Sequence, residues 1–133
     1  MDHEEYLRTN KVSHTIIGAA IDVHRELGPG LLESVYEECL RIELEAKGLK
    51  VEVQKDLPLY YKGQKTEKTY RIDMLIDERV IVELKSVESL KPVNEIQLVT
   101  YLKLSNLRVG LLINFNVPVL KDGIKRKVNN FSE

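Results

Sequence analysis

The chain has 133 residues, 43% of them hydrophobic and 31% charged, a balance and length that indicate one globular domain over residues 1–133. Its formal net charge of −1 excludes the overall basicity of a strong nonspecific nucleic-acid binder, so such contacts would need a local basic patch. No apolar run could span a bilayer and the acidic N-terminus is unlike a signal peptide, so we expect no membrane contact and a cytoplasmic protein.

Two helices are predicted at the start of the chain. Apolar residues recur at helical spacing over 12–27, and the segment 28–30 (G-P-G) ends that helix, because glycine permits the left-handed exit and proline cannot continue it. Residues 1–10 show no such period, and we expect them to fray. A second helix is predicted over 31–47, closed by Gly48.

Three side chains on these helices are candidates for a function, and each has a structural alternative. His24, near the end of the first helix, fits a cap or packing role better than metal ligation. Cys39 is the only cysteine, and we interpret it as a small buried hydrophobe and not a nucleophile. Glu33 falls in the first turn of the second helix, where the helix dipole alone would justify a carboxylate.

An antiparallel meander is predicted for the middle of the chain. Its strands are 51–61, interrupted at Pro58, then 67–77 and 80–85, with a tight turn between the last two. Matching of the apolar rows fixes the register, because a slip by one residue would turn one row to the wrong face. The expected opposed pairs are Ile76 with Val80, Met74 with Val82, Ile72 with Leu84 and Asp73 with Glu83.

Asp73 and Glu83 are the chemically informative pair of this hairpin. Directly opposed side chains have Cβ atoms about 5 Å apart, and two carboxylates at that distance repel unless a positive group lies between them. A divalent cation such as Mg²⁺ would suit, with Lys85 beside it. Charged residues on the outer face of an amphipathic hairpin are also common, and on the hairpin alone a solvated face is the favoured explanation.

A third helix is predicted over 92–104, because Pro92 suits the first helical position. Gln97 and Tyr101 are four residues apart and share one face of it, a spacing that is usually just surface. The packing side is expected to comprise Val93, Ile96, Val99 and Leu102.

The C-terminal part contains one strongly apolar strand. Segment 108–115 is expected to be buried on both faces and to run parallel to 80–85, since a strand–helix–strand connection is right-handed. Residues 119–128 should form a short final strand or hairpin, and 129–133 are expected to be disordered.

Two clusters of basic residues are candidate nucleic-acid contacts, although solubilising surface lysines explain them at least as well. They are Lys62, Lys65 and Lys68 before the hairpin, and Lys121, Lys125, Arg126 and Lys127 near the C-terminus.

The order of these marked residues carries a resemblance to a known family. The series Glu33, Asp73, E-L-K at 83–85, Gln97 and Tyr101 resembles the PD-(D/E)XK nuclease superfamily. More closely, segment 23–36 (V-H-R-E-L-G-P-G-L-L-E-S-V-Y) resembles the signature of the small GxxExxY proteins, a branch of that superfamily. The likeness covers about residues 12–128. It implies a restriction-endonuclease-like α/β core, in which an antiparallel meander and a parallel fourth strand form a mixed sheet flanked by helices. The proline that often precedes the aspartate is replaced by Ile72.

The resemblance also implies roles for individual residues. Asp73 and Glu83 would bind Mg²⁺ or Mn²⁺ together with the backbone carbonyl of Leu84, and Glu33 would reach the metal directly or through water. Lys85 would position or deprotonate the attacking water. Gln97 and Tyr101 would help to hold the site or the strand being cut.

Three functions remain open at this point. The favoured one is a divalent-metal-dependent nuclease that hydrolyses phosphodiester bonds, with DNA as the favoured nucleic-acid partner. The second is a catalytically inactive module of the nuclease fold that binds nucleic acid or protein, which the low charge and small size fit better. The third is a structural domain whose hairpin charges have no role. A homodimer is also an open alternative, but no residue of the sequence gives specific evidence for one.

Overall fold

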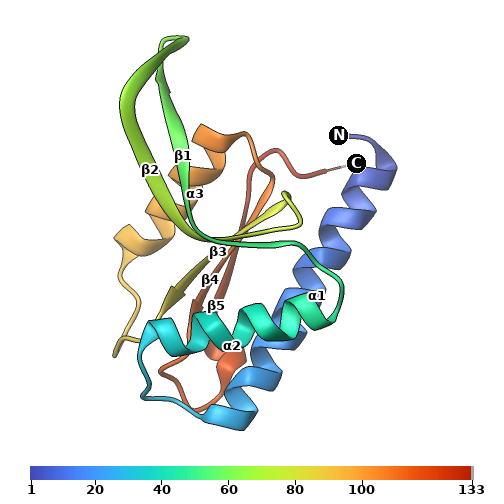
Figure 1. Ribbon diagram of the computed structural model, residues 1–133, viewed down its shortest axis with the longest axis vertical. Helices are drawn as coiled ribbons and strands as arrows, with labels where there is room; N and C mark the ends of the chain where they lie inside the picture. The colour runs from blue at the N-terminus through green and yellow to red at the C-terminus, as the bar shows by residue number, and fades with distance from the viewer. Residues whose placement is uncertain (133) are drawn as a thin grey trace.

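The computed structural model describes residues 1–132 (Figure 1). Within them the elements follow the order α1 (His3–Leu27), α2 (Glu33–Ala46), β1 (Val51–Tyr61), β2 (Gln64–Ile76), β3 (Val80–Lys85), α3 (Pro92–Ser105), β4 (Val109–Asn114), the 3-10 helix η1 (Leu120–Gly123) and β5 (Ile124–Val128).

The strands form one mixed sheet in the order β1-β2-β3-β4-β5. β1, β2 and β3 are antiparallel neighbours, β3 and β4 are parallel, and β5 returns antiparallel to β4. Helix α3 connects the two parallel strands, as a strand–helix–strand unit requires. The predicted α/β class is therefore confirmed: an antiparallel meander plus a parallel fourth strand, flanked by helices, with β5 as a fifth strand.

Helices cover both faces of the sheet. α1 and α2 pack on one face, where the larger core cluster joins residues such as Ile16 and Leu40 to Met74, Val82 and Leu111. α3 covers the other face through a smaller cluster. Burial of each such aliphatic side chain is worth about 1.5–3 kcal/mol, so the sheet is held from both sides.

The smaller cluster differs from the expected packing of α3. Leu98 and Leu102 are buried against the sheet, whereas Val93 and Ile96 are exposed. The predicted packing face was therefore wrong for Val93 and Ile96. Apolar residues occur around most of this helix, and its sequence therefore defines no single stripe. The buried face of α3 is set by the close approach of Leu98 to Gly110 of β4, where an added Cβ would lie 2.7 Å from Leu98 Cδ1.

Both chain ends are better ordered than predicted. α1 begins at His3, because the Asp2 side chain accepts a hydrogen bond from Glu5 N at 2.9 Å and caps the helix. The Tyr6 ring stacks on Phe131 with 4.5 Å between centroids. Asn129 N donates to Arg108 O at 2.8 Å. The expected fraying of 1–10 and disorder of 129–132 are therefore wrong, and Glu133 lies outside the described residues.

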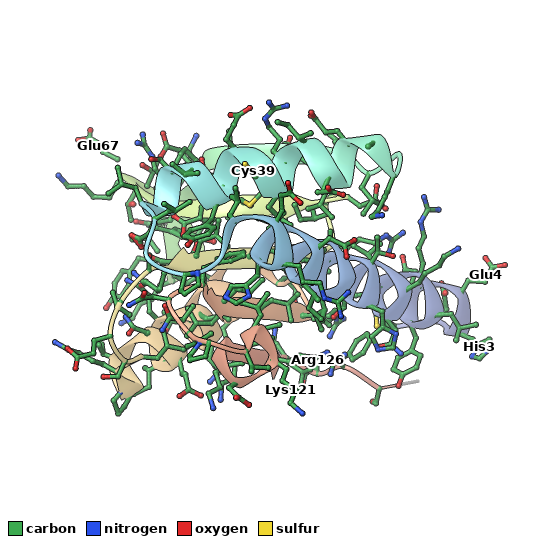
Figure 2. All side chains as sticks on the ribbon, turned by 90° about the horizontal axis from the view of Figure 1, so that it is seen from below. His3, Glu4, Cys39, Glu67, Lys121 and Arg126 are labelled. Atoms are coloured by element: carbon green, nitrogen blue, oxygen red, sulfur yellow. The ribbon has the colours of Figure 1, made fainter. Side chains whose placement is uncertain are left out.

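Two single residues on the helices take structural positions. His24 is buried, and its Nε2 lies 2.8 Å from Val117 O, in agreement with a packing role. Cys39 is half-buried beside the larger core cluster (labelled in Figure 2). Among residues 1–132, none of the helices combines the length and apolar content that crossing a membrane needs.

Candidate functional site

The site starts where the β2–β3 ladder ends. Ile76 pairs with Val80 and Met74 with Val82, which confirms the predicted register at these positions. One step further, Asp73 N donates to Glu83 Oε2 at 2.7 Å, and Leu84 N donates to Asp73 Oδ2 at 2.8 Å. Each carboxylate thus accepts from a backbone amide of the opposite strand, and the two acidic side chains lie side by side.

The expected apolar pair beyond this point is wrong. Ile72 belongs to the cluster under α3, whereas Leu84 belongs to the cluster under α1 and α2. The alternation of β2 is therefore interrupted at Asp73, because the carboxylate–amide hydrogen bonds replace the ladder there. On the other neighbouring strand, Gln54 adopts a left-handed backbone with φ 47° at the same level.

Glu83 is an unusual carboxyl group because only 8% of the residue is exposed. Burial first, and the charge of Asp73 second, raise its pKa to about 8, although the hydrogen bond from Asp73 N and the Lys85 ammonium act in the opposite direction. Protein groups alone therefore leave the charged form of this pair poorly stabilised. A cation that contacts both carboxylates would stabilise their charged form.

The donor set fits a hard divalent cation. Within residues 1–132 no three His, Cys, Asp or Glu side chains are grouped closely enough to hold a metal ion by themselves. Mg²⁺ needs no such cage, since it binds through one or two carboxylates and completes its shell with other oxygens, including water. Asp73 and Glu83 can provide the carboxylates, and the Leu84 backbone can provide a carbonyl oxygen.

Helix α2 places further carboxylates near Asp73. Glu33 is the first residue of α2, exposed to solvent. It lines a cavity of about 310 Å³ that also reaches Asp73. The lining residues are Glu33, Ser34, Glu37, Gln54, Asp73 and Leu84.

Tyr36 fixes the α1–α2 loop, which leads directly into Glu33. Its hydroxyl donates to Gly28 O at 2.6 Å and accepts from Leu31 N at 3.1 Å, while its ring stacks on Phe115 at 4.3 Å. Ser86 Oγ, directly after β3, donates to Leu31 O at 2.6 Å. The α1–α2 loop is thus fastened both to the core and to the strand end that carries Lys85.

Glu37 and Gln54 were not identified from the sequence. Gln54 Nε2 donates to Glu37 Oε2 at 2.8 Å and lies 3.5 Å from Asp73 Oδ1. Burial raises the pKa of Glu37, and the charge of Asp73 adds to the rise, while the bond from Gln54 lowers it. Glu37 could have been found, because it lies four residues after Glu33 on the same helix face. Gln54 could not, since its position depends on a left-handed backbone.

Asn114 is a further residue that the sequence reading missed. It is buried at the end of β4, paired with Lys85 in the parallel ladder. Its side chain accepts from Val87 N at 3.1 Å and donates to Val87 O at 3.0 Å, so it holds the segment that follows β3. The signal was a single amide residue in an otherwise apolar strand.

The remaining predicted residues lie at different distances from the carboxylates. Lys85 is half-buried and close enough to Glu83 to lower its pKa. Tyr101 stacks on Tyr70 at 5.1 Å; burial raises its pKa, and the charges of Glu83 and Asp73 add to the rise. Gln97 is exposed one turn earlier on α3, and its side chain forms no hydrogen bond within the described part of the chain.

Comparison with known protein families gives a match over most of the chain. The sequence model of the PD-(D/E)XK nuclease superfamily matches residues 10–127. No curated protein and no solved structure matches the chain. The matched range includes the whole sheet except the last residue of β5, and with it every residue discussed above as part of the site. The chain therefore belongs to the PD-(D/E)XK nuclease superfamily.

Proposed function

We propose that this protein is a divalent-metal-dependent nuclease whose metal site is formed by Asp73, Glu83 and the backbone carbonyl of Leu84. The observation that carries the proposal is the adjacent pair of carboxyl groups, one of them buried and with its pKa raised to about 8. Proteins tolerate such a pair where a cation or a shared proton is part of the function. The superfamily membership supports the same assignment.

The residues around the pair suit phosphodiester hydrolysis. When bound, Mg²⁺ or Mn²⁺ supplies charge that offsets the transition state and lowers the pKa of a coordinated water. Lys85 adds a positive charge beside Glu83 and would orient the phosphate or the attacking water. Glu33 and Glu37 line the cavity next to Asp73 and would hold water by hydrogen bonds. Tyr101 would contact the strand being cut, and DNA remains the favoured substrate.

Cleavage assays with three single variants test the proposal. We expect Asp73→Ala, Glu83→Ala and Lys85→Ala to fold and to lose cleavage of DNA with Mg²⁺ or Mn²⁺, by at least about a hundredfold. Lys47→Ala removes an exposed lysine directly after α2, outside both basic clusters, and should cleave like the wild type. A wild-type protein that cleaves neither a DNA nor an RNA panel with either metal would contradict the proposal.

A second candidate function is a binding module without catalysis, favoured by the net charge of −1. Thermal unfolding in a Mg²⁺ or Mn²⁺ titration separates the candidates in two steps. A rise in melting temperature that Asp73→Ala abolishes shows a metal site, since a ligand bound only by the folded state must stabilise it. Metal binding without cleavage would then favour the second function.

A further inference from the structure

Strands β1 and β2 extend well beyond the rest of the sheet. β3 pairs with β2 only at 74–76, whereas the β1–β2 pairing continues to Tyr61 and Gln64. Figure 1 shows this hairpin as the projection at the top of the view, away from α1 and α2. We refer to residues 57–70 as the β arm. An isolated two-stranded ribbon adds little to stability, so its length requires another explanation.

The tip of the β arm presents two exposed aromatic rings. Tyr60 and Tyr61 are 55% and 65% exposed, although tyrosine usually packs its ring against other apolar groups. Neighbouring strand residues point to opposite faces, so each face of the tip carries one ring. Lys62 Nζ lies 5.5 Å from the centre of the Tyr61 ring.

The same tip is basic in a chain that is slightly acidic overall. Residues 59–68 contain the lysines Lys62, Lys65 and Lys68 against one glutamate, while the whole chain has a net charge of −1. All three lysines are exposed, and none forms an ion pair within residues 1–132. Further down the arm, by contrast, Arg71 Nε is paired with Asp56 Oδ1 at 2.9 Å. Unpaired positive charge is thus concentrated where the rings are.

A bulge fixes the geometry of the tip. Pro58 pairs with Thr69, but the next pair is Tyr60 with Lys65, so β2 has extra residues opposite Leu59. Thr66 Oγ1 donates to Leu59 O at 2.8 Å and accepts from Lys68 N at 3.1 Å. This brace sets the register that puts Tyr60 and Lys65 on one face.

We infer that the β arm binds single-stranded nucleic acid, with bases stacked on Tyr60 and Tyr61 and phosphates contacted by Lys62, Lys65 and Lys68. Exposed rings combined with basic residues are the elements that bind single strands, whose bases are free to stack. Base faces in a duplex are covered by their neighbours. If single strands bind here, they are also the substrate class of the nuclease; this assignment of substrate rests on the proposed function.

The arm is well placed to deliver such a strand. Gln54, next to Asp73, lies six residues before Tyr60 on the same strand, which corresponds to about 20 Å along β1. A strand of a few nucleotides spans that distance, so one molecule can occupy the tip and reach the cavity beside Asp73.

The test measures binding apart from cleavage. Fluorescence anisotropy follows labelled DNA and RNA single strands of about 20 nucleotides, and the matching duplex, with EDTA present so that no metal supports hydrolysis. Wild-type protein should bind the single strands more tightly than the duplex. Tyr60→Ala combined with Tyr61→Ala should weaken binding at least about tenfold. Lys65→Glu combined with Lys68→Glu should weaken it and reduce the slope of log K against log salt by about 1.4.

A matched control makes the same charge change elsewhere. Lys11→Glu combined with Lys47→Glu alters two exposed lysines that belong to neither basic cluster, one on α1 and one directly after α2. This control should bind within about twofold of the wild type. Thermal unfolding of each variant verifies its fold, which substitutions at exposed positions should preserve.

Several results would overturn the inference: no binding of single strands by the wild type, tighter binding of the duplex, arm variants that bind normally, or an equal loss in the control. An arm that mediates pairing of two copies would instead give an arm-dependent dimer in sedimentation with unchanged oligonucleotide binding. Arm-dependent binding without metal-dependent cleavage would support the arm and contradict the nuclease. Equal cleavage of single strands and duplex, unchanged in the arm variants, would support the nuclease and contradict the proposed role of the arm.

Discussion

Glu83 shows at the residue scale why this site requires a counter-charge. Its carboxyl group is buried next to Asp73, and the pKa is raised to about 8 by burial first and by Asp73 second. The backbone amides of Asp73 and Leu84 orient the two carboxylates without neutralising them. The metal-free protein therefore holds a proton that the unfolded chain, with a value near 4.5, would release.

This difference predicts how stability depends on pH. Between about pH 4.5 and pH 8 the folded state binds more protons than the unfolded state, so the free energy of unfolding falls as pH rises. We expect Glu83 to contribute a loss on the order of 1–3 kcal/mol across that window. Urea denaturation in EDTA at several pH values measures it. Glu83→Gln should remove this component, and an unchanged pH profile in that variant would contradict the assignment.

Tyr36 provides a second prediction at this scale. Tyr36→Phe removes the donor to Gly28 O and leaves Leu31 N without its acceptor, so we expect a loss of about 1–2 kcal/mol in the free energy of unfolding. Cleavage should also fall, because the same loop orients Glu33. Tyr6→Phe, which keeps its stack on Phe131, is the matched control and should change neither quantity. Equal effects of the two substitutions would indicate that the loop contacts do not matter.

At the scale of elements, the sequence predicted those features that depend on local pattern. Alternation in 70–85 was enough to place Met74 opposite Val82, because burial of one face selects the register. The parallel strand β4 followed from its apolar run and from the handedness of the connection. The place of Gln54 in the site could not be predicted, since a left-handed residue inside a strand depends on the partners of its side chain.

The buried face of α3 also could not be predicted from the sequence pattern, and it gives a third prediction. Its buried face is set by contact of Leu98 with Gly110, where an added Cβ would lie 2.7 Å from Leu98 Cδ1. Gly110→Ala should therefore destabilise the protein by about 1–3 kcal/mol through overpacking. Gly18→Ala has open space around it on helix α1 and should be neutral or stabilising by up to about 1 kcal/mol. Thermal unfolding compares them, and a neutral Gly110→Ala would show that α3 shifts freely.

At the scale of the whole molecule, the sheet collects residues that are distant in the chain. β2 and β3 supply Asp73 and Glu83, α2 supplies Glu33 and Glu37, and β1 supplies Gln54. The superfamily match confirms the broader resemblance found in the sequence, whereas the narrower likeness to GxxExxY proteins stays a prediction. Sequence order could indicate most of these residues, but only the folded sheet brings α2 beside Gln54 and Asp73.

The central claim is that Asp73 and Glu83 together bind a divalent cation. Anomalous diffraction from a crystal soaked in Mn²⁺ tests it most directly, because manganese scatters anomalously and occupies magnesium sites. We predict one peak in contact with both carboxylates and with the carbonyl oxygen of Leu84, absent from a crystal of Asp73→Asn. A fully soaked wild-type crystal with no peak between the two side chains, or with manganese bound only elsewhere, would contradict the account.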